Sequence, residues 1–96
     1  MVKIHRVYFF PADGYLHSRV MITKLMDDGK TETCVDPYST TTVLVNEDHY
    51  PAVIGVLNLL GYIFMNLGHG WHDPEDEDMV PEACVIYECV GWPPDA

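Results

Sequence analysis

Positive charge is missing from most of the chain. All five Lys and Arg residues lie in the first 30 positions, and neither residue occurs after Lys30. The 66 residues from Thr31 onward carry 12 carboxylates, and the whole chain of 96 residues has a formal net charge of −10. Such a charge distribution repels polyanions and attracts a basic partner. We therefore expect no direct contact with nucleic acid or with an anionic membrane.

One feature of the N-terminal part runs against this exclusion. Basic and aromatic side chains alternate there, and that combination can follow a phosphate backbone and stack on bases. The excess of carboxylates in the rest of the chain opposes such binding. The residues concerned are Arg6, Arg19, Lys24 and Lys30 with Tyr8, Phe9, Phe10 and Tyr15.

Catalytic motifs are also missing. The sequence has no G-x-S-x-G elbow, no glycine-rich phosphate loop and no H-E-x-x-H pair. A single small core leaves little room for a substrate pocket of roughly 300–1,000 Å³. We expect a protein that is not an enzyme and that needs no cofactor.

Cysteine is scarce. The chain has three cysteines, Cys34, Cys84 and Cys89, and no C-x-x-C motif. An odd number outside any ligand pattern indicates small buried side chains in a reducing compartment. On one strand Cys84 and Cys89 would point to opposite faces and could not bridge each other. The start of the chain also lacks a basic segment followed by an apolar one, so we expect a cytoplasmic protein.

Four β-rich segments fill the first half of the chain. Residues 2–10, 15–26 and 31–36 are rich in β-branched and aromatic residues. Residues 40–45, TTTVLV, have the same composition. We predict a strand in each, the last one being short. Asp27-Asp28-Gly29-Lys30 predicts a hairpin, because Asp-Gly suits the backbone angles of a tight turn.

The most apolar part of the chain, residues 46–68, predicts one helix over about 47–60. Asn46 or Asp48 would cap its start, and Gly61 suits the left-handed position after its end. Tyr62 to Met65 has strand composition, although the helix could instead continue to Leu67. The side chains predicted to face the sheet are Val53, Val56, Leu57 and Leu60.

An uncharged stretch in the same region raises the question of a membrane span. Residues 50–67 approach the ~20 residues that a spanning helix needs. They contain a proline, two glycines and two asparagines and have no basic flank. We therefore expect a buried helix and strand rather than a membrane span.

The last apolar segment completes the predicted fold. Residues 83–90, ACVIYECV, are apolar on both faces, as expected for a central strand, and Pro93 and Pro94 cannot continue it. We predict a single α+β domain over residues 1–96. Its mainly antiparallel sheet of 4–6 strands has one principal helix on one face, in the order β-β-β-(β)-α-β-β.

Residues 68–82, GHGWHDPEDEDMVPE, hold the candidate metal ligands. His69, His72 and Asp73 could contribute to a metal- or small-ligand-binding module. Zinc sites need more converging nitrogen or sulfur ligands than these, and the acids lack the glycine of a calcium loop. We therefore predict no metal site here.

The same segment contains the densest negative charge of the chain. Asp73-Pro74 could start one acidic helical turn near 74–79. If extended, the run would instead place a carboxylate every ~3.3 Å, close to the ~3.4 Å charge spacing of a DNA strand. We predict a partner-binding surface with an aromatic anchor. Its residues are Trp71, Asp73, Glu75, Asp76, Glu77, Asp78 and Glu82.

In size and charge the chain resembles small, acidic, phage-encoded inhibitors of restriction and CRISPR nucleases. That group shares no fold, so the resemblance assigns no residues. It implies an inhibitor that binds a basic nucleic-acid-handling protein or complex. Two alternatives stay open, the ligand-binding module and an accessory subunit whose strand edge pairs with a larger partner. A homodimer through residues 2–10 or 83–90 also stays open.

Overall fold

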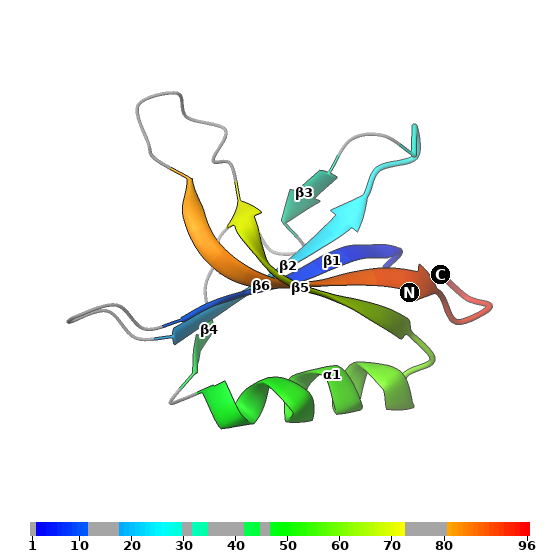
Figure 1. Ribbon diagram of the computed structural model, residues 1–96. Coiled ribbons are helices and arrows are strands. Elements are labelled where there is room, and N and C mark those ends of the chain that lie inside the picture. The colour runs from blue at the N-terminus through cyan, green and yellow to red at the C-terminus, as the bar shows by residue number, and fades with distance from the viewer. Residues whose placement is uncertain (1, 12–17, 30–31, 35–41, 45–46, 73–80) are drawn as a thin grey trace.

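The computed structural model shows an antiparallel β-sheet with one α-helix packed on one face (Figure 1). This confirms the predicted α+β class and the antiparallel sheet. No helix among the described residues is long and apolar enough to cross a membrane. The structure describes residues 2–11, 18–29, 32–34, 42–44, 47–72 and 81–96.

Six strands lie in the described part of the chain, and all their pairings are antiparallel. The order across the sheet is β3-β2-β1-β6-β5, and β4 also pairs with β2. Strand β5 therefore forms one edge of the sheet, while the short β3 and β4 flank β2 on the other side. The strands are β1 (Ile4–Phe10), β2 (Ser18–Leu25), β3 (Glu32–Cys34), β4 (Thr42–Leu44), β5 (Ile63–His72) and β6 (Glu82–Gly91).

Strand β1 is apolar on both faces, which suits its place inside the sheet. Val7 and Phe9 belong to the core on the helix side, where Tyr50 joins them. Tyr8 and Phe10 are buried on the opposite side. Because successive side chains of a strand point to opposite faces, β1 contributes to both layers.

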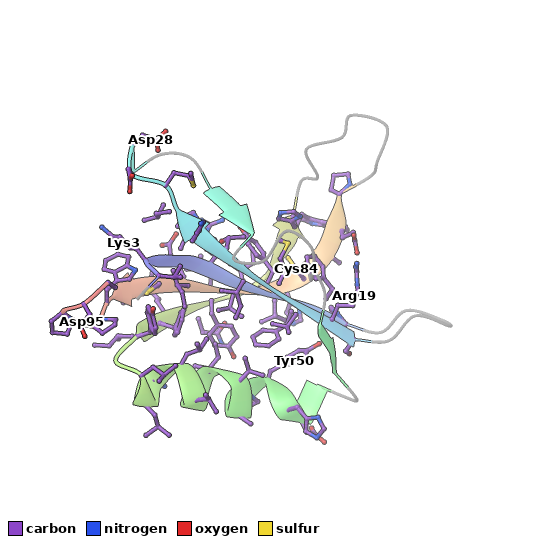
Figure 2. All side chains as sticks on the ribbon, turned by 180° about the vertical axis from the view of Figure 1, so that it is seen from behind. Lys3, Arg19, Asp28, Tyr50, Cys84 and Asp95 are labelled. Carbon is purple, nitrogen blue, oxygen red and sulfur yellow. The ribbon has the colours of Figure 1, made fainter. Side chains whose placement is uncertain are left out.

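Strand β6 repeats this pattern, as the apolar segment 83–90 predicts. Cys84 and Ile86 pack with the aromatic residues of β1 on the helix-free side, and Val85 and Tyr87 join the core on the helix side. Figure 2 shows Tyr50 between the helix and the sheet and Cys84 on the other side of the sheet. Cys89 lies in a third cluster.

The helix begins later than predicted. Residues Glu47–His49 form a 3-10 turn, and α1 spans Tyr50–Leu59. The N-cap residue is His49, whose side chain makes no capping hydrogen bond, so the cap predicted at Asp48 is wrong. Asn46, the other predicted cap, lies outside the described residues.

The buried face of α1 also differs from the prediction. Tyr50, Val53, Ile54 and Leu57 face the sheet, a set with the i, i+3, i+4, i+7 spacing of one helix face. Val56 and Leu60, both predicted to be buried, are exposed. The helix has apolar residues all round, so its periodicity could not show which face meets the sheet.

The end of the helix agrees with the prediction. Gly61 has a φ of 104° and its N–H donates to Asn58 O at 3.0 Å, while the Tyr62 N–H donates to Leu57 O at 3.1 Å. This pair of hydrogen bonds is the Schellman arrangement that commonly ends a helix at glycine. The chain then enters β5, so a helix continuing to Leu67 is wrong.

Strand β5 is longer than its composition indicates, and it contains a bulge. It runs to His72, and Leu67 has no partner on β6 because the register shifts between Asn66 and Gly68. Gly68 has a φ of 77°, as is common at a bulge. The extra residue reverses the alternation of the side chains. Phe64 therefore joins the core on the helix side, whereas His72 packs edge-to-face against Tyr8 on the other side.

The two ends of the chain meet at one end of the sheet (Figure 1). Trp92 Nε1 donates to Ile4 O at 2.7 Å, and the Tyr62 hydroxyl donates to Val2 O. Lys3 Nζ lies 4.8 Å from the centroid of the Trp92 ring. Strand β6 ends at Gly91, before the two prolines, as predicted.

Two glycines offer a matched test of the helix end. A Cβ at position 61 would lie 2.8 Å from Pro93 Cβ, and the φ of Gly61 disfavours any other residue. We expect Gly61→Ala to lower the free energy of unfolding by about 1–3 kcal/mol. Gly55 lies inside α1 with open space around it, so Gly55→Ala should raise stability by up to about 1 kcal/mol. Urea unfolding of both variants measures the difference, and equal effects would contradict this account.

Candidate functional site

The two described residues of the predicted partner-binding set lie at the adjoining ends of β5 and β6. Trp71 lies near the end of β5 with 68% of its surface exposed, and Glu82 is the first residue of β6. Asp73, Glu75, Asp76, Glu77 and Asp78 lie outside the described residues. The structure thus places the two flanks of the acidic segment.

The candidate metal ligands do not converge. His69 is paired with Val85, which belongs to the core on the helix side, and His72 is paired with Glu82. The His72 ring packs on Tyr8 at 4.8 Å, on the helix-free side. Residues three apart on a strand point to opposite faces, so the two imidazoles cannot share an ion. Within the described residues, no three His, Cys, Asp or Glu side chains form a group that could hold a metal.

Glu82 has a partner within the chain. Its carboxylate accepts a hydrogen bond from Arg19 Nη2 on β2, and both side chains are partly exposed. The Arg19 guanidinium also lies 4.7 Å from the Phe10 ring. The charge of Glu82 is therefore largely compensated by Arg19.

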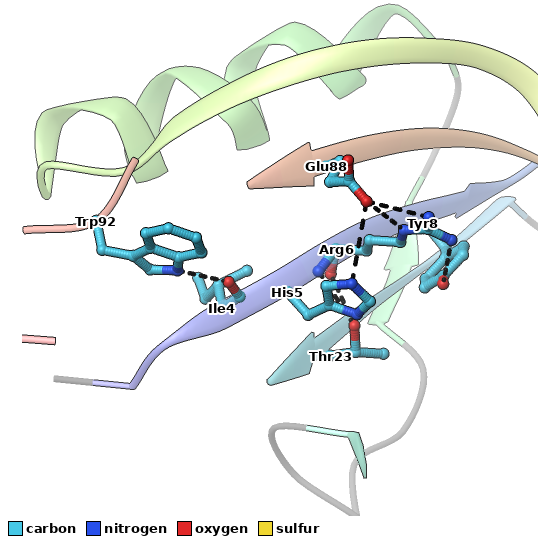
Figure 3. Close-up of polar contacts among 7 residues, drawn as sticks. All are labelled: Ile4, His5, Arg6, Tyr8, Thr23, Glu88 and Trp92. Atoms are coloured by element: carbon cyan, nitrogen blue, oxygen red, sulfur yellow. Dashed lines mark hydrogen bonds and ion pairs between the residues drawn. The ribbon is translucent and has the colours of Figure 1, made fainter. Parts of the chain in front are cut away.

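A second ion pair crosses from β1 to β6 (Figure 3). Arg6 Nε and Nη2 donate to Glu88 Oε1 at 3.2 and 3.1 Å, and Nη1 donates to the Tyr8 hydroxyl at 3.4 Å. His5 Nε2 lies 4.0 Å from the same carboxylate oxygen. The hydrogen bond to Tyr8 raises the pKa of Arg6, burial opposes this, and Glu88 adds to the increase.

The backbone of Arg6 is held by a buried hydroxyl. The Arg6 N–H donates to Thr23 Oγ1 at 3.2 Å, and that hydroxyl donates to Arg6 O at 3.3 Å. The register between β1 and β2 shifts between Ile4 and Val7, so the ladder cannot bond Arg6 in the regular way. Thr23 satisfies the backbone at this irregularity and fixes where the guanidinium lies.

These contacts occupy part of the set of basic and aromatic residues named in the sequence. Tyr8 and Phe10 are buried, so their faces are not open for base stacking. Arg6 and Arg19 are each paired with a carboxylate. Of the four basic residues considered, Lys30 lies outside the described residues. Sequence inspection missed both ion pairs, because each joins an N-terminal cation to an acid more than 60 residues away.

Apolar side chains are exposed on the outer face of α1. Val56, Leu59 and Leu60 point away from the sheet, and Leu59 is 89% exposed. None of the ten residues of the helix is charged. A helix that is apolar all round usually has protein on both sides. Its outer face is therefore an unusual surface for a chain that is so rich in acids.

A second exposed apolar set follows the edge strand β5. Ile63, Met65 and Leu67 are all more than two-fifths exposed, as is Val90 in the neighbouring part of β6. Ile63 and Met65 are alternate residues of the strand, and Leu67 is its unpaired bulge residue. Exposed apolar patches of this kind commonly mark interaction sites.

The described cysteines are poorly suited to nucleophilic chemistry. Cys84 and Cys89 are free and buried, and burial raises the pKa of each thiol. A thiol with a raised pKa holds little thiolate at neutral pH. The two residues lie on opposite faces of β6, as predicted. The side chain of Cys34 lies outside the description.

No known protein family matches the sequence, and neither the curated proteins nor the solved structures include a significant match.

The buried thiols predict a loss of stability at alkaline pH. Their pKa values are higher in the folded protein than the ordinary 9.0, so the unfolded chain releases these protons first. The free energy of unfolding should then fall as pH rises from about 9, because the folded state retains protons that the unfolded state loses. Urea unfolding at pH 7.5 and pH 10 measures the fall. Replacing Cys84 and Cys89 by Ala should reduce it, and an unchanged slope would assign the effect to other groups such as Tyr62, whose pKa is also raised by burial.

Proposed function

We propose that the protein is a small, acidic, non-enzymatic interaction protein that inhibits a basic nucleic-acid-handling protein or complex. The observation that carries the proposal is the exposed Trp71. It lies on an edge strand, two residues before the first acid of the segment that begins at Asp73. An exposed aromatic side chain beside dense negative charge is a suitable anchor for a basic groove.

The distribution of charge supports the same proposal. Arg6 and Arg19 are paired with Glu88 and Glu82, so these two cations do not offset the acids of residues 73–78. A net charge of −10 would speed the approach to a basic surface. A partner that normally binds nucleic acid has such a surface. We place the protein in the cytoplasm, where such complexes act on nucleic acid.

An accessory subunit is the second candidate function. The uncharged helix α1 with exposed Val56, Leu59 and Leu60 favours it, because such a face is typical of a subunit interface. Binding through this face would depend little on salt. Binding through carboxylates would weaken steeply as the screening length falls from ~10 Å at 0.1 M to ~3 Å at 1 M salt.

The acidic segment can be tested by charge reversal. We expect replacement of Glu75, Asp76, Glu77 and Asp78 by Lys to abolish capture of a nucleic-acid-binding partner from an extract of the native host. The expected partner is captured by the unmodified protein at low salt and released by added double-stranded DNA, because both compete for one basic surface. Mass spectrometry of the captured proteins provides the measurement. Equal capture by the reversed variant would exclude the proposed mode of binding.

The aromatic anchor has its own test and control. We expect Trp71→Ala to weaken binding to the captured partner by about 2 kcal/mol, as is typical of a central interface residue. Leu59→Ala removes a similarly exposed apolar side chain from the outer face of α1 and should leave the affinity unchanged. Calorimetry with the purified partner measures the affinity of each variant. The opposite ranking would favour the accessory-subunit function.

A further inference from the structure

We propose that the protein forms a symmetric dimer in which β5 pairs antiparallel with β5 of a second copy. The inference concerns the assembly of the protein and does not depend on the proposed function. It starts from the position of β5, which pairs only with β6 among the described strands. An edge strand presents unpaired N–H and C=O groups that another strand can satisfy.

Strand β5 lacks most of the features that usually protect a sheet edge. Its ten residues, IFMNLGHGWH, include no Lys, Arg, Asp, Glu or Pro. It is also as long as β6, whereas β3 and β4 beyond β2 have three residues each. Proteins that remain monomeric usually protect such an edge with charge, proline or a very short strand. Its pairing with β6 shifts register between Ile63 and Phe64 and again at Leu67, and such a bulge is a protective feature that β5 does have.

The edge is long enough to hold a dimer together. A ten-residue antiparallel ladder makes about ten backbone hydrogen bonds, which is the number in a typical protein–protein interface. The pairing would also bring the exposed side chains of Ile63, Met65 and Leu67 against those of the second copy. Burial of apolar side chains adds roughly 25 cal/mol for each Å² removed from water.

The charge of the chain determines the direction of the pairing. Two copies that each carry −10 repel each other, and the acidic run begins directly after His72 at the C-terminal end of β5. Parallel pairing would bring these two ends together. Antiparallel pairing separates them by about the length of the strand, ~34 Å, which is several times the ~8 Å screening length at physiological salt. A second copy therefore fits this edge in the antiparallel direction.

A two-fold symmetric dimer pairs the unpaired backbone groups of both β5 edges at once. In a two-fold symmetric interface each copy contributes the same surface, so one contact pairs both β5 strands. The backbone of β5 forms the contact. The sheets of the two copies would then be continuous across the dimer axis.

The test compares two double variants that change the net charge equally. Met65→Lys with Leu67→Lys places charge on the edge, and Val56→Lys with Leu59→Lys places it on the outer face of α1. All four positions are exposed, so each variant should fold. Each double variant changes the net charge from −10 to −8, so the two differ in where the added charge lies and not in its amount. Circular dichroism of each variant establishes that the fold is kept.

Sedimentation equilibrium over a range of concentrations measures association. We expect the unmodified protein and the helix variant to dimerise with similar affinity, and the edge variant to have a dissociation constant at least about tenfold higher. Hydrogen exchange should show protection of Ile63–His72 amides that increases with protein concentration. An unmodified protein that stays monomeric, with concentration-independent exchange in β5, would overturn the proposal. Loss of the dimer in the helix variant alone would also overturn it, by placing the interface on α1.

Discussion

Strand β1 imposes the constraint on which the other elements depend. It lies between β2 and β6 and is buried on both faces, so it needs a hydrophobic layer on each side. Helix α1 supplies one layer, starting from the stacking of Tyr50 on Phe9 at 4.2 Å. No described helix covers the other face. There the aromatic side chains of β1 are covered by Cys84, Ile86, Met21, Arg19 and His72 from the neighbouring strands.

The helix-free face brings together charges that lie far apart in the sequence. Arg6 and Arg19 lie in the N-terminal strands, and their partners Glu88 and Glu82 lie in the C-terminal strand. Placing β6 beside β1 brings these distant segments together. Since partly exposed ion pairs contribute little to stability, their main effect is to orient the two arginines over the aromatic layer.

Much of the fold could be predicted from local sequence. The strands of the first half, the glycine that ends the helix and the interior position of residues 83–90 all follow from composition and turn chemistry. The orientation of α1 could not be predicted, because Val56 and Leu60 are as apolar as Val53 and Leu57. The full length of β5 could not be predicted from local sequence either. Gly68, Gly70 and two histidines resemble a loop, and only pairing with β6 makes this segment a strand.

The candidate site was harder to predict than the fold. Spacing alone suggested that His69 and His72 could act together, and this fails because a strand directs them to opposite faces. The ion pairs of Arg6 and Arg19 have no local signal at all, since they depend on which strands become neighbours. The exposure of Trp71 follows from its position on an edge strand, a property of the whole sheet rather than of the residues beside it.

The meeting of the chain ends has a practical consequence. Lys3 lies against Trp92, and Asp95 lies at the same end of the molecule as Lys3, while the β5–β6 hairpin points away from them (Figures 1 and 2). A tag, fluorophore or surface tether attached at either terminus would therefore be held away from the end of β5 that carries Trp71. Immobilisation through either end should leave that end of the hairpin free to meet a large molecule in solution.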